Sequence, residues 1–255
     1  MGRIITLTTD FGENDYFVGA VKGVILSINP KVKIVDITHQ LPTFNPISAA
    51  FTLKNFYNYF PAGTTHLAVV DPGVGGKRRP VLVQTEKYSF IGPDNGIFSW
   101  IGEPFKRIIH LNNSKYFLSP VSSTFQARDI FAPTAAYLSL GIEINQFGKP
   151  LEKIVKLEIP KVQFKKNKTI GEIIHVDNFG NLISNIRPEN LKAGIRAIKI
   201  KGRKILKISQ TFSRAPRNEI LTYWGSAGFL EIGVNCGSAA QILKAKIGEK
   251  VEIVL

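Results

Sequence analysis

The sequence predicts an α/β protein with two domains. Strand-like and helix-like segments alternate up to about residue 148, a pattern typical of a mostly parallel sheet covered by helices. Beyond Pro150 the pattern changes to short alternating strands, which is typical of an all-β domain. We therefore expect an N-terminal α/β domain with a mostly parallel central sheet over residues 1–150, and a smaller, barrel-like all-β domain over residues 165–255.

Apolar β-branched runs predict the strands, and apolar residues at helical spacing predict the helices. The first expected helix closes at Asn29-Pro30, and the second ends where Pro61 and Gly63 break it. The expected strands of the first domain are residues 4–9, 33–37, 67–70 and 88–91, and its expected helices are residues 16–28, 46–59 and 129–140. The expected strands of the second domain are residues 169–175, 197–201, 205–208, 230–233 and 251–255.

The composition is that of an ordinary soluble globular protein, with 255 residues of which 44% are hydrophobic and 20% charged. No stretch reaches the ~18 continuous apolar residues of a membrane helix, so we expect a cytoplasmic protein without a membrane partner. Cys236 is the only cysteine, which excludes an intramolecular disulfide and a cysteine metal cage. Because small residues follow it, we expect Cys236 to be buried as a small apolar residue.

The formal net charge of +14 lies mostly in the second part of the chain. Residues 1–150 hold 14 Lys+Arg and 10 Asp+Glu, whereas residues 151–255 hold 19 and 9. Runs such as 165–168 and 199–204 could bind nucleic-acid phosphates. However, the alternation Ile198-Lys199-Ile200-Lys201 is typical of a half-buried strand with a solvated lysine face. We favour the solvated face and expect no nucleic-acid partner.

Two expected strands of the first domain each end in an aspartate that is followed by glycine. Asp10 follows the first strand, while Asp71 follows the third and opens the glycine-rich turn 71–76. Open α/β sheets bind ligands at the carboxyl ends of their strands, and an unpaired buried carboxylate is costly. Both aspartates are therefore site candidates. Arg78 adds a positive charge directly after the glycine-rich turn that Asp71 opens.

Short motifs of this kind occur in order along nearly the whole chain. They are Thr8-Thr9-Asp10-Phe11-Gly12, Val35-Asp36-Ile37-Thr38-His39, Asp71-Pro72-Gly73-Val74-Gly75, Pro93-Asp94-Asn95-Gly96, Thr124-Phe125 with Arg128-Asp129-Ile130-Phe131-Ala132-Pro133, Asp177-Asn178-Phe179-Gly180-Asn181, and residues 231–240. Together they resemble the S-adenosylmethionine hydroxide adenosyltransferase family, whose relatives include the fluorinase and the chlorinase. Each motif alone is weak, whereas the ordered set is specific.

The resemblance implies hydrolysis of S-adenosylmethionine to adenosine and L-methionine, by in-line attack of water on the ribose 5′ carbon. The sulfonium leaving group already activates this carbon, so no metal and no cofactor are expected. The resemblance also implies a homotrimer, with the substrate between the N-terminal domain of one subunit and the C-terminal domain of the next. Because the substrate is a cation, a strongly basic protein needs carboxylates close to it.

By the resemblance, Asp71 and Arg78 handle the attacking water, and Gln126 stands where the family has a catalytic histidine. Glutamine can orient a water through its amide, but it cannot accept a proton near neutral pH. The substrate-binding residues implied for the first domain are Asp10 at the ribose hydroxyls, Asp15 at the methionine ammonium, Phe44 against the nucleoside, and Phe125 at the ribose and adenine.

Five residues of the second domain are also implied to contact the substrate. They are Asp177 as a local negative charge, Phe179 at the ribose and adenine, Asn181 and the backbone near Asn235 at the adenine edge, and Ser226 at the methionine carboxylate. Each has a structural alternative, because an aspartate that ends a strand can cap a helix and a phenylalanine is usually a core residue.

Three other functions are alternatives to hydrolysis. Since Gln126 replaces the histidine, the protein could bind S-adenosylmethionine or adenosine with reduced or lost turnover. The positive charge of residues 151–255 is also compatible with a nucleic-acid-binding module. Halogenation ranks low, because halogenating relatives lack the Asp and Arg pair and the Asp71 carboxylate would disfavour a halide nearby. Ala227 also stands where the fluorinase has an arginine.

Overall fold

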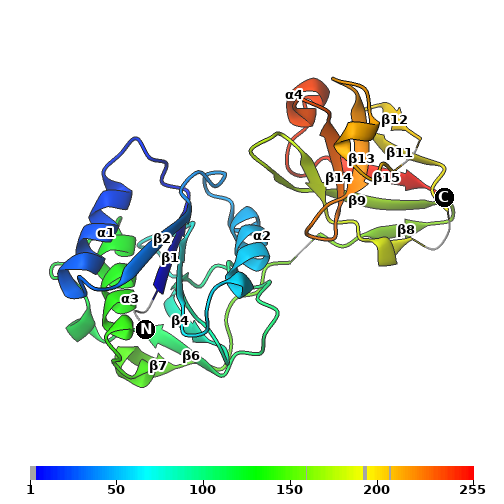
Figure 1. Cartoon of the computed structure of the whole chain (residues 1–255). Coiled ribbons are helices and arrows are strands. Elements are labelled where there is room, and N and C mark those ends of the chain that lie inside the picture. The colour runs from blue at the N-terminus through cyan, green and yellow to red at the C-terminus, as the bar shows by residue number, and fades with distance from the viewer. Residues whose placement is uncertain (1–3, 159, 192–193, 207) are drawn as a thin grey trace. The chain divides into compact units, whose positions relative to one another are not determined.

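The structure is a computed structural model that describes residues 4–158, 160–191, 194–206 and 208–255 (Figure 1). It forms two compact units, Met1–Leu157 and Glu158–Leu255. The expected fold class is confirmed, since the first unit is α/β with a mostly parallel sheet and the second is an antiparallel, barrel-like sheet. None of the helices in the described residues is long and apolar enough to cross a membrane.

The sheet of the first unit has the strand order β2-β1-β3-β5-β4-β6-β7. Its strands are β1 (Ile4–Thr9), β2 (Lys33–Thr38), β3 (Thr65–Val69), β4 (Pro80–Gln84), β5 (Ser89–Pro93), β6 (Arg107–Leu111) and β7 (Gly148–Pro150). The first four strands of this order are parallel, while β4 is antiparallel to both of its neighbours. Thr9 pairs with Val69, so β1 and β3 end together at one edge of the sheet.

Helices cover both faces of this sheet. The helices α1 (Phe17–Ile28) and α3 (Ala132–Ser139) pack on one face, and α2 (Pro46–Phe56) packs on the other (Figure 1). Leu7 and Ile25 belong to the core of the first face, and Leu53 and Phe90 to that of the second. A turn of π-helix, Ala127–Phe131, precedes α3. Short 3-10 helices occupy Tyr57–Tyr59, Ser114–Tyr116 and Ile144–Phe147.

The second unit is an antiparallel sheet in the order β12-β11-β15-β9-β10-β14-β13, with β8 paired to β9. Its elements are β8 (Gln163–Lys165), β9 (Lys168–Val176), β10 (Leu182–Ser184), β11 (Ala197–Ile200), β12 (Arg203–Ile205), β13 (Ile220–Trp224), β14 (Leu230–Val234), α4 (Ala239–Leu243), β15 (Lys250–Val254), and 3-10 helices at Pro188–Asn190 and Phe212–Arg214. A bridge between Ile208 and Thr222 joins the chain after β12 to β13. This bridge links the two ends of the sheet, so the barrel is nearly closed around a core that includes Leu230 and Val251.

The strand expected at residues 205–208 is wrong in position. The observed strand β12 runs from Arg203 to Ile205, and residue 207 of the expected strand lies outside the described residues. The reason is the turn before it, where Lys201 and Gly202 both have positive φ, 47° and 75°. Two such residues form the tight hairpin turn that right-twisted strands prefer, so β12 pairs with β11 directly from Arg203.

Candidate active site

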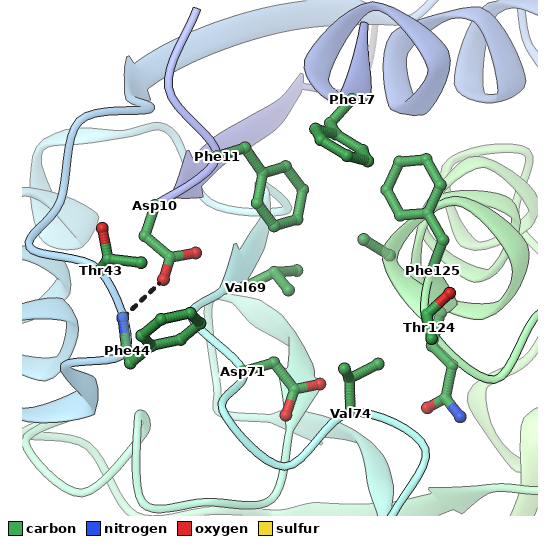
Figure 2. Close-up of a pocket in the computed structure, with 12 residues that line it drawn as sticks. Asp10, Phe11, Phe17, Thr43, Phe44, Val69, Asp71, Val74, Thr124 and Phe125 are labelled. Atoms are coloured by element: carbon green, nitrogen blue, oxygen red, sulfur yellow. Dashed lines mark hydrogen bonds between the residues drawn. The ribbon is translucent and has the colours of Figure 1, made fainter. Parts of the chain in front are cut away.

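A hollow of about 240 Å³ lies where β1 and β3 end (Figure 2), and we call it the first hollow. The residues that line it are Asp10, Phe11, Phe17, Thr43, Phe44, Val69, Asp71, Val74, Thr124, Phe125, Gln126 and Ala127. Because β1 and β3 are parallel neighbours, the aspartates that follow them reach the same edge of the sheet. The structure therefore brings together Asp10, Asp71 and Gln126, which are far apart in the sequence.

Asp10 is partly buried directly after β1. Its Oδ2 accepts a hydrogen bond of 2.9 Å from the backbone N–H of Phe44 (Figure 2). Burial raises the pKa of Asp10, and the nearby negative charge of Asp71 raises it further, although the hydrogen bond from Phe44 acts in the opposite direction. Phe44 has a φ of 60°, and its side chain is 70% exposed. The hydrogen bond from its backbone thus places a largely exposed aromatic residue next to the Asp10 carboxylate.

Asp71 and Arg78 form a bidentate ion pair at this hollow. Arg78 Nε lies 3.0 Å and 2.9 Å from the two carboxylate oxygens of Asp71, and Nη2 lies 2.5 Å from Oδ2. The Arg78 side chain is 10% exposed and that of Asp71 is 6% exposed, so little water reaches the pair. The guanidinium also lies 5.6 Å from the centre of the Phe131 ring. The carboxylate is thereby held in one orientation at the wall of the hollow.

Glycine in the turn after Asp71 makes this arrangement possible. Gly75 has a φ of +74°, and a Cβ there would lie 2.4 Å from the carbonyl oxygen of Ser123. Only glycine allows this close approach between the turn and the segment that leads to Gln126. The approach places Asp71 and Gln126 on the same hollow.

Gln126 lies directly before the turn of π-helix. Its side-chain oxygen is buried and has no hydrogen-bond partner within the described part of the chain. Gln126 lines the first hollow, and buried polar atoms almost always have a partner, so this unpaired oxygen is a candidate acceptor for a donor supplied by water or a ligand. The role of Gln126 at the attacking water stays a prediction.

Aromatic rings form the apolar wall of the first hollow. Phe125 is 8% exposed, and its ring meets the Phe17 ring edge-on with 5.1 Å between the centres. The Arg128 guanidinium lies 5.0 Å from the centre of the Phe125 ring. Asp15, in contrast, is exposed and is not among the residues that line this hollow.

A second hollow, of about 680 Å³, lies in the second unit. It is lined by Asp177, Phe179, Asn181, Phe212, Tyr223, Gly225, Ser226, Glu231, Val234, Asn235, Cys236 and Gly237. All five residues that the sequence analysis selected in this domain are in this set. They come from the turn after β9, the start of β10 and the segments around β14, so the barrel brings together residues that are far apart in sequence.

Asp177 organises the turn that carries Phe179 and Asn181. Its Oδ1 accepts hydrogen bonds from the backbone N–H groups of Phe179 (3.0 Å) and Asn181 (2.8 Å), and its Oδ2 accepts from Nδ2 of Asn181 (2.8 Å). The amide of Asn181 is therefore fixed, with its N–H side toward Asp177 and its carbonyl oxygen turned away. Phe179 is left 76% exposed at the hollow. The arrangement presents a ring face and an amide edge, the two groups that recognise a purine.

Glu231 and Tyr223 add a buried polar pair that the sequence pattern does not predict. They face each other across β14 and β13, and a hydrogen bond joins their side chains. Glu231 is 9% exposed, and burial raises the pKa of both side chains. Gly225 makes room for the carboxyl group, because a Cβ there would lie 1.8 Å from Oε1 of Glu231.

Comparison with known proteins identifies the family. The family model of the SAM hydroxide adenosyltransferase N-terminal domain matches residues 5–148, and that of the C-terminal domain matches residues 171–252. The chain belongs to this family. Membership of this family shows that the protein is an enzyme. The matched ranges contain every residue that lines the two hollows.

Three similar proteins illustrate the range of SAM hydroxide adenosyltransferase relatives. An (R)-S-adenosyl-L-methionine hydrolase of Methanocaldococcus jannaschii is 35% identical and covers 98% of this chain and 95% of its own length. A fluorinase of Actinoplanes sp. is 27% identical, with coverages of 98% and 97%. The crystal structure of an uncharacterized conserved protein from Thermotoga maritima superposes with a TM-score of 0.89 at 34% identity, covering 98% of this chain and 100% of that chain.

Several residues of this SAM hydroxide adenosyltransferase site were missed from the sequence. Phe11 and Thr124 lie inside the quoted motifs, and Glu231 begins the last one, so their positions in the motifs were a usable signal. Phe17 and Tyr223 lie outside the motifs, and nothing in the neighbouring sequence marks them as site residues. Their places depend on how α1 and β13 pack, which the sequence pattern does not specify.

The expectation that Cys236 is a buried apolar residue is wrong. Cys236 is exposed, lines the second hollow and has a φ of 59°. The reason is the tight turn after β14, in which the N–H of Gly237 donates to the carbonyl of Val234 at 3.2 Å. This turn directs residue 236 outward instead of continuing the buried strand.

Proposed function

We propose that this protein hydrolyses S-adenosyl-L-methionine to adenosine and L-methionine, with water attacking the ribose 5′ carbon in line with the carbon–sulfur bond. The observation that carries this proposal is the oriented, buried Asp71–Arg78 pair at the first hollow, beside the unpaired carbonyl of Gln126. The name of the Methanocaldococcus jannaschii relative, which is 35% identical over nearly the full chain, supports the same reaction.

The charges of the two hollows suit a cationic substrate. The formal net charge of the chain is +14, yet the residues that line the two hollows include four acids and, within the described residues, no lysine or arginine. The acids are Asp10, Asp71, Asp177 and Glu231. Asp71 is paired with Arg78, whereas Asp10, Asp177 and Glu231 have no cationic partner among the described residues, and their carboxyl groups favour a cationic substrate.

In the proposed chemical step the water oxygen forms a bond to the 5′ carbon while the carbon–sulfur bond breaks. The electron pair of that bond goes to sulfur, which becomes the neutral thioether of methionine, and the water gives up one proton. Asp71 stands at the hollow to accept this proton or to orient the water, and Arg78 keeps the carboxylate in position. Gln126 accepts a hydrogen bond from the water through its side-chain oxygen. The good leaving group makes a metal or a cofactor unnecessary.

The binding roles follow the two hollows. In the first, Asp10 binds the ribose hydroxyls, and Phe44 and Phe125 contact the nucleoside. In the second, Phe179 stacks on the base, Asn181 and the backbone near Asn235 bind the adenine edge, and Asp177 and Ser226 bind the methionine ammonium and carboxylate. We keep Asp15 as a residue that meets the methionine ammonium, although it is exposed and lines neither hollow.

The configuration of the sulfonium is a further part of the proposal. The printed name of the Methanocaldococcus jannaschii relative specifies the (R) form of S-adenosyl-L-methionine. We infer that this chain also prefers the (R) epimer, and that the enzyme removes this form of the methyl donor. Incubation with each separated epimer tests this preference, because an enzyme that ignores the sulfonium centre would release adenosine at equal rates from both.

We also propose a cytoplasmic homotrimer with its active sites at subunit interfaces. Each hollow alone carries only part of the predicted residue set, which supports a site that is completed by assembly. Light scattering of the purified protein would give about three times the chain mass of 28.2 kDa if the trimer forms. A monomer that is active at nanomolar concentration would contradict this assembly.

The experiment that tests the proposed function is chromatographic detection of adenosine from S-adenosylmethionine, with an enzyme-free control and a Gln126→His variant. Adenosine from the unaltered protein is the expected result. The second candidate, a binding protein without turnover, is motivated by Gln126 and predicts product from the variant alone. In that case calorimetry would still show saturable binding by the unaltered protein.

A further inference from the structure

The turn Pro93-Asp94-Asn95-Gly96 is one of the quoted motifs, and the proposed chemistry does not use it. The turn comes at the end of β5, and its residues do not line the first hollow. Its side chains nevertheless form hydrogen bonds with Val70, which precedes Asp71, and with Arg79, which follows Arg78. These contacts involve both ends of the 71–78 turn.

Asn95 holds the peptide that leads into Asp71. Its Nδ2 donates a hydrogen bond of 2.8 Å to the carbonyl oxygen of Val70, and its Oδ1 accepts a bond of 3.3 Å from the N–H of Ile97. Val70 is fully buried. Strand β3 ends one residue earlier, at Val69, so the Asn95 amide fixes the backbone where the strand stops.

Asp94 holds the residue that follows Arg78. Its side chain is 1% exposed, and its Oδ2 accepts hydrogen bonds from Nε (2.9 Å) and Nη2 of Arg79. The backbone adds another link, because the N–H of Asp94 donates to the carbonyl oxygen of Arg79 at 2.8 Å. The second carboxylate oxygen, Oδ1, accepts from the N–H of Val155 at 2.7 Å. Both oxygens of this buried carboxylate are thus occupied.

The turn between Asp71 and Arg78 needs such support. It contains three glycines, at positions 73, 75 and 76, and glycine gives a chain more conformational freedom than any other residue. A bidentate pair that closes a glycine-rich turn keeps its orientation only if both ends of the turn are fixed. Asn95 fixes the end before Asp71, and Asp94 fixes the end after Arg78.

We propose that Asp94 and Asn95 are positioning residues, which set the orientation of the Asp71–Arg78 pair toward the nucleophilic water. The inference rests on the proposed function, because it assigns a purpose to the pair in that reaction. The two residues touch neither hollow and act through Val70 and Arg79. A merely structural turn would change the stability of the protein without a selective effect on turnover.

The variant Asn95→Asp tests this inference, because it replaces the amide donor by a carboxylate oxygen that faces the Val70 carbonyl. We expect kcat to fall about 10- to 100-fold, since small misplacements of catalytic groups reduce the rate of the chemical step by such factors. The KM for S-adenosylmethionine should stay within about twofold, because the binding residues are elsewhere. A crystal structure of the variant should show Asp71 and Arg78 displaced from their bidentate contact.

Asn113→Asp is a matched control. Asn113 makes the same pair of bonds, from Nδ2 to the carbonyl of Gln146 at 2.7 Å and from the N–H of Lys115 to its Oδ1 at 3.2 Å, but it lines neither hollow. Its kcat should stay within about twofold of the unaltered protein. Arg79→Lys is the second variant if Asn95→Asp does not fold, and it should lower kcat with KM unchanged and a displaced pair.

Two results would overturn the inference. One is an unchanged kcat with the Asp71–Arg78 pair in place, and the other is a lower kcat with the pair still in place in the crystal. The proposed function fails separately, if the unaltered protein releases no adenosine. In that case the crystallographic comparison of Asn95→Asp with Asn113→Asp still decides whether the turn positions the pair.

Discussion

The two hollows hold their carboxylates in different ways. In the first, Asp71 has a cationic partner in Arg78, and both side chains are nearly buried. In the second, Asp177 is satisfied by backbone N–H groups and an amide, and Glu231 by the hydroxyl of Tyr223. An ion pair fixes a charged group for chemistry, whereas neutral donors leave the negative charge available to a cationic ligand. We therefore assign chemistry to the first hollow and recognition of the substrate mainly to the second.

The largest expected effect comes from breaking the ion pair of the first hollow. Asp71→Asn should lower kcat about 10³-fold, because loss of a positioned proton acceptor or water-orienting group costs 10² to 10⁴. Arg78→Ala should have an effect of similar size, since it leaves a buried carboxylate without its partner. The rate of adenosine formation at saturating S-adenosylmethionine measures both.

Glu86→Gln is the control for these variants. Glu86 forms an ion pair with Lys106 on the surface, where the Glu86 side chain is 67% exposed, and such pairs contribute little. Full activity of Asp71→Asn beside an active control would remove Asp71 from the mechanism. It would also end the distinction that we draw between the two hollows.

A smaller effect, on binding instead of turnover, is expected in the second hollow. Phe179→Ala removes a ring that is 76% exposed, so the fold should be unaffected. Stacking of a base on an aromatic ring contributes about 1–3 kcal/mol, which predicts a KM roughly 10- to 100-fold higher and a nearly unchanged kcat. Phe164→Ala, which removes another exposed ring of the same unit, is the control. A selective loss of kcat in Phe179→Ala would place this ring in the chemistry.

The raised pKa of Glu231 predicts that the stability of the protein depends on pH. Burial raises its pKa above the usual value of 4.5, so the folded protein binds this proton more tightly than the unfolded chain. The resulting stability is present below pH 4.5 and is lost as the pH rises through the folded pKa. Glu231→Gln should therefore flatten the fall in Tm from pH 4.5 upward, as measured by thermal unfolding across this range.

Glu252→Gln gives the opposite sign and serves as the comparison. The hydrogen bond from Lys168 lowers the pKa of Glu252, so its contribution to stability is present at neutral pH and is lost as the solution becomes acidic. Removing it should lower Tm slightly at neutral pH and not at acidic pH. Identical profiles of Tm against pH for the two variants would show that burial does not set the pKa of Glu231.

The smallest effect is expected for nucleic acid. The lysine-rich strands of the second unit include Lys199, which faces Glu252 on β15, and Lys168, which pairs with Glu252 at 2.8 Å. These contacts favour a solvated charged face. Electrophoretic retardation of single- and double-stranded probes should therefore show no complex at moderate salt, whereas a tight complex that weakens steeply with salt would support a nucleic-acid-binding function.

Much of the first hollow could be predicted from the sequence, because its geometry follows from local rules. Two parallel strands that end in aspartates must deliver Asp10 and Asp71 to one edge. Tyr223 was missed because its pairing with Glu231 depends on the register of β13 against β14, which the residue pattern does not define. The position of β12 was wrong for a related reason, since two positive-φ residues set the hairpin turn. Long-range register and turn conformation were thus the information that the residue pattern lacked.

The central claim is that a water molecule, oriented at the first hollow, attacks the ribose 5′ carbon. The most direct measurement is the reaction in water enriched in oxygen-18, with mass analysis of the adenosine that is formed. The account predicts one heavy oxygen in the 5′ hydroxyl group of adenosine and none in methionine. Adenosine without the label, or label in methionine, would contradict attack of water at this carbon.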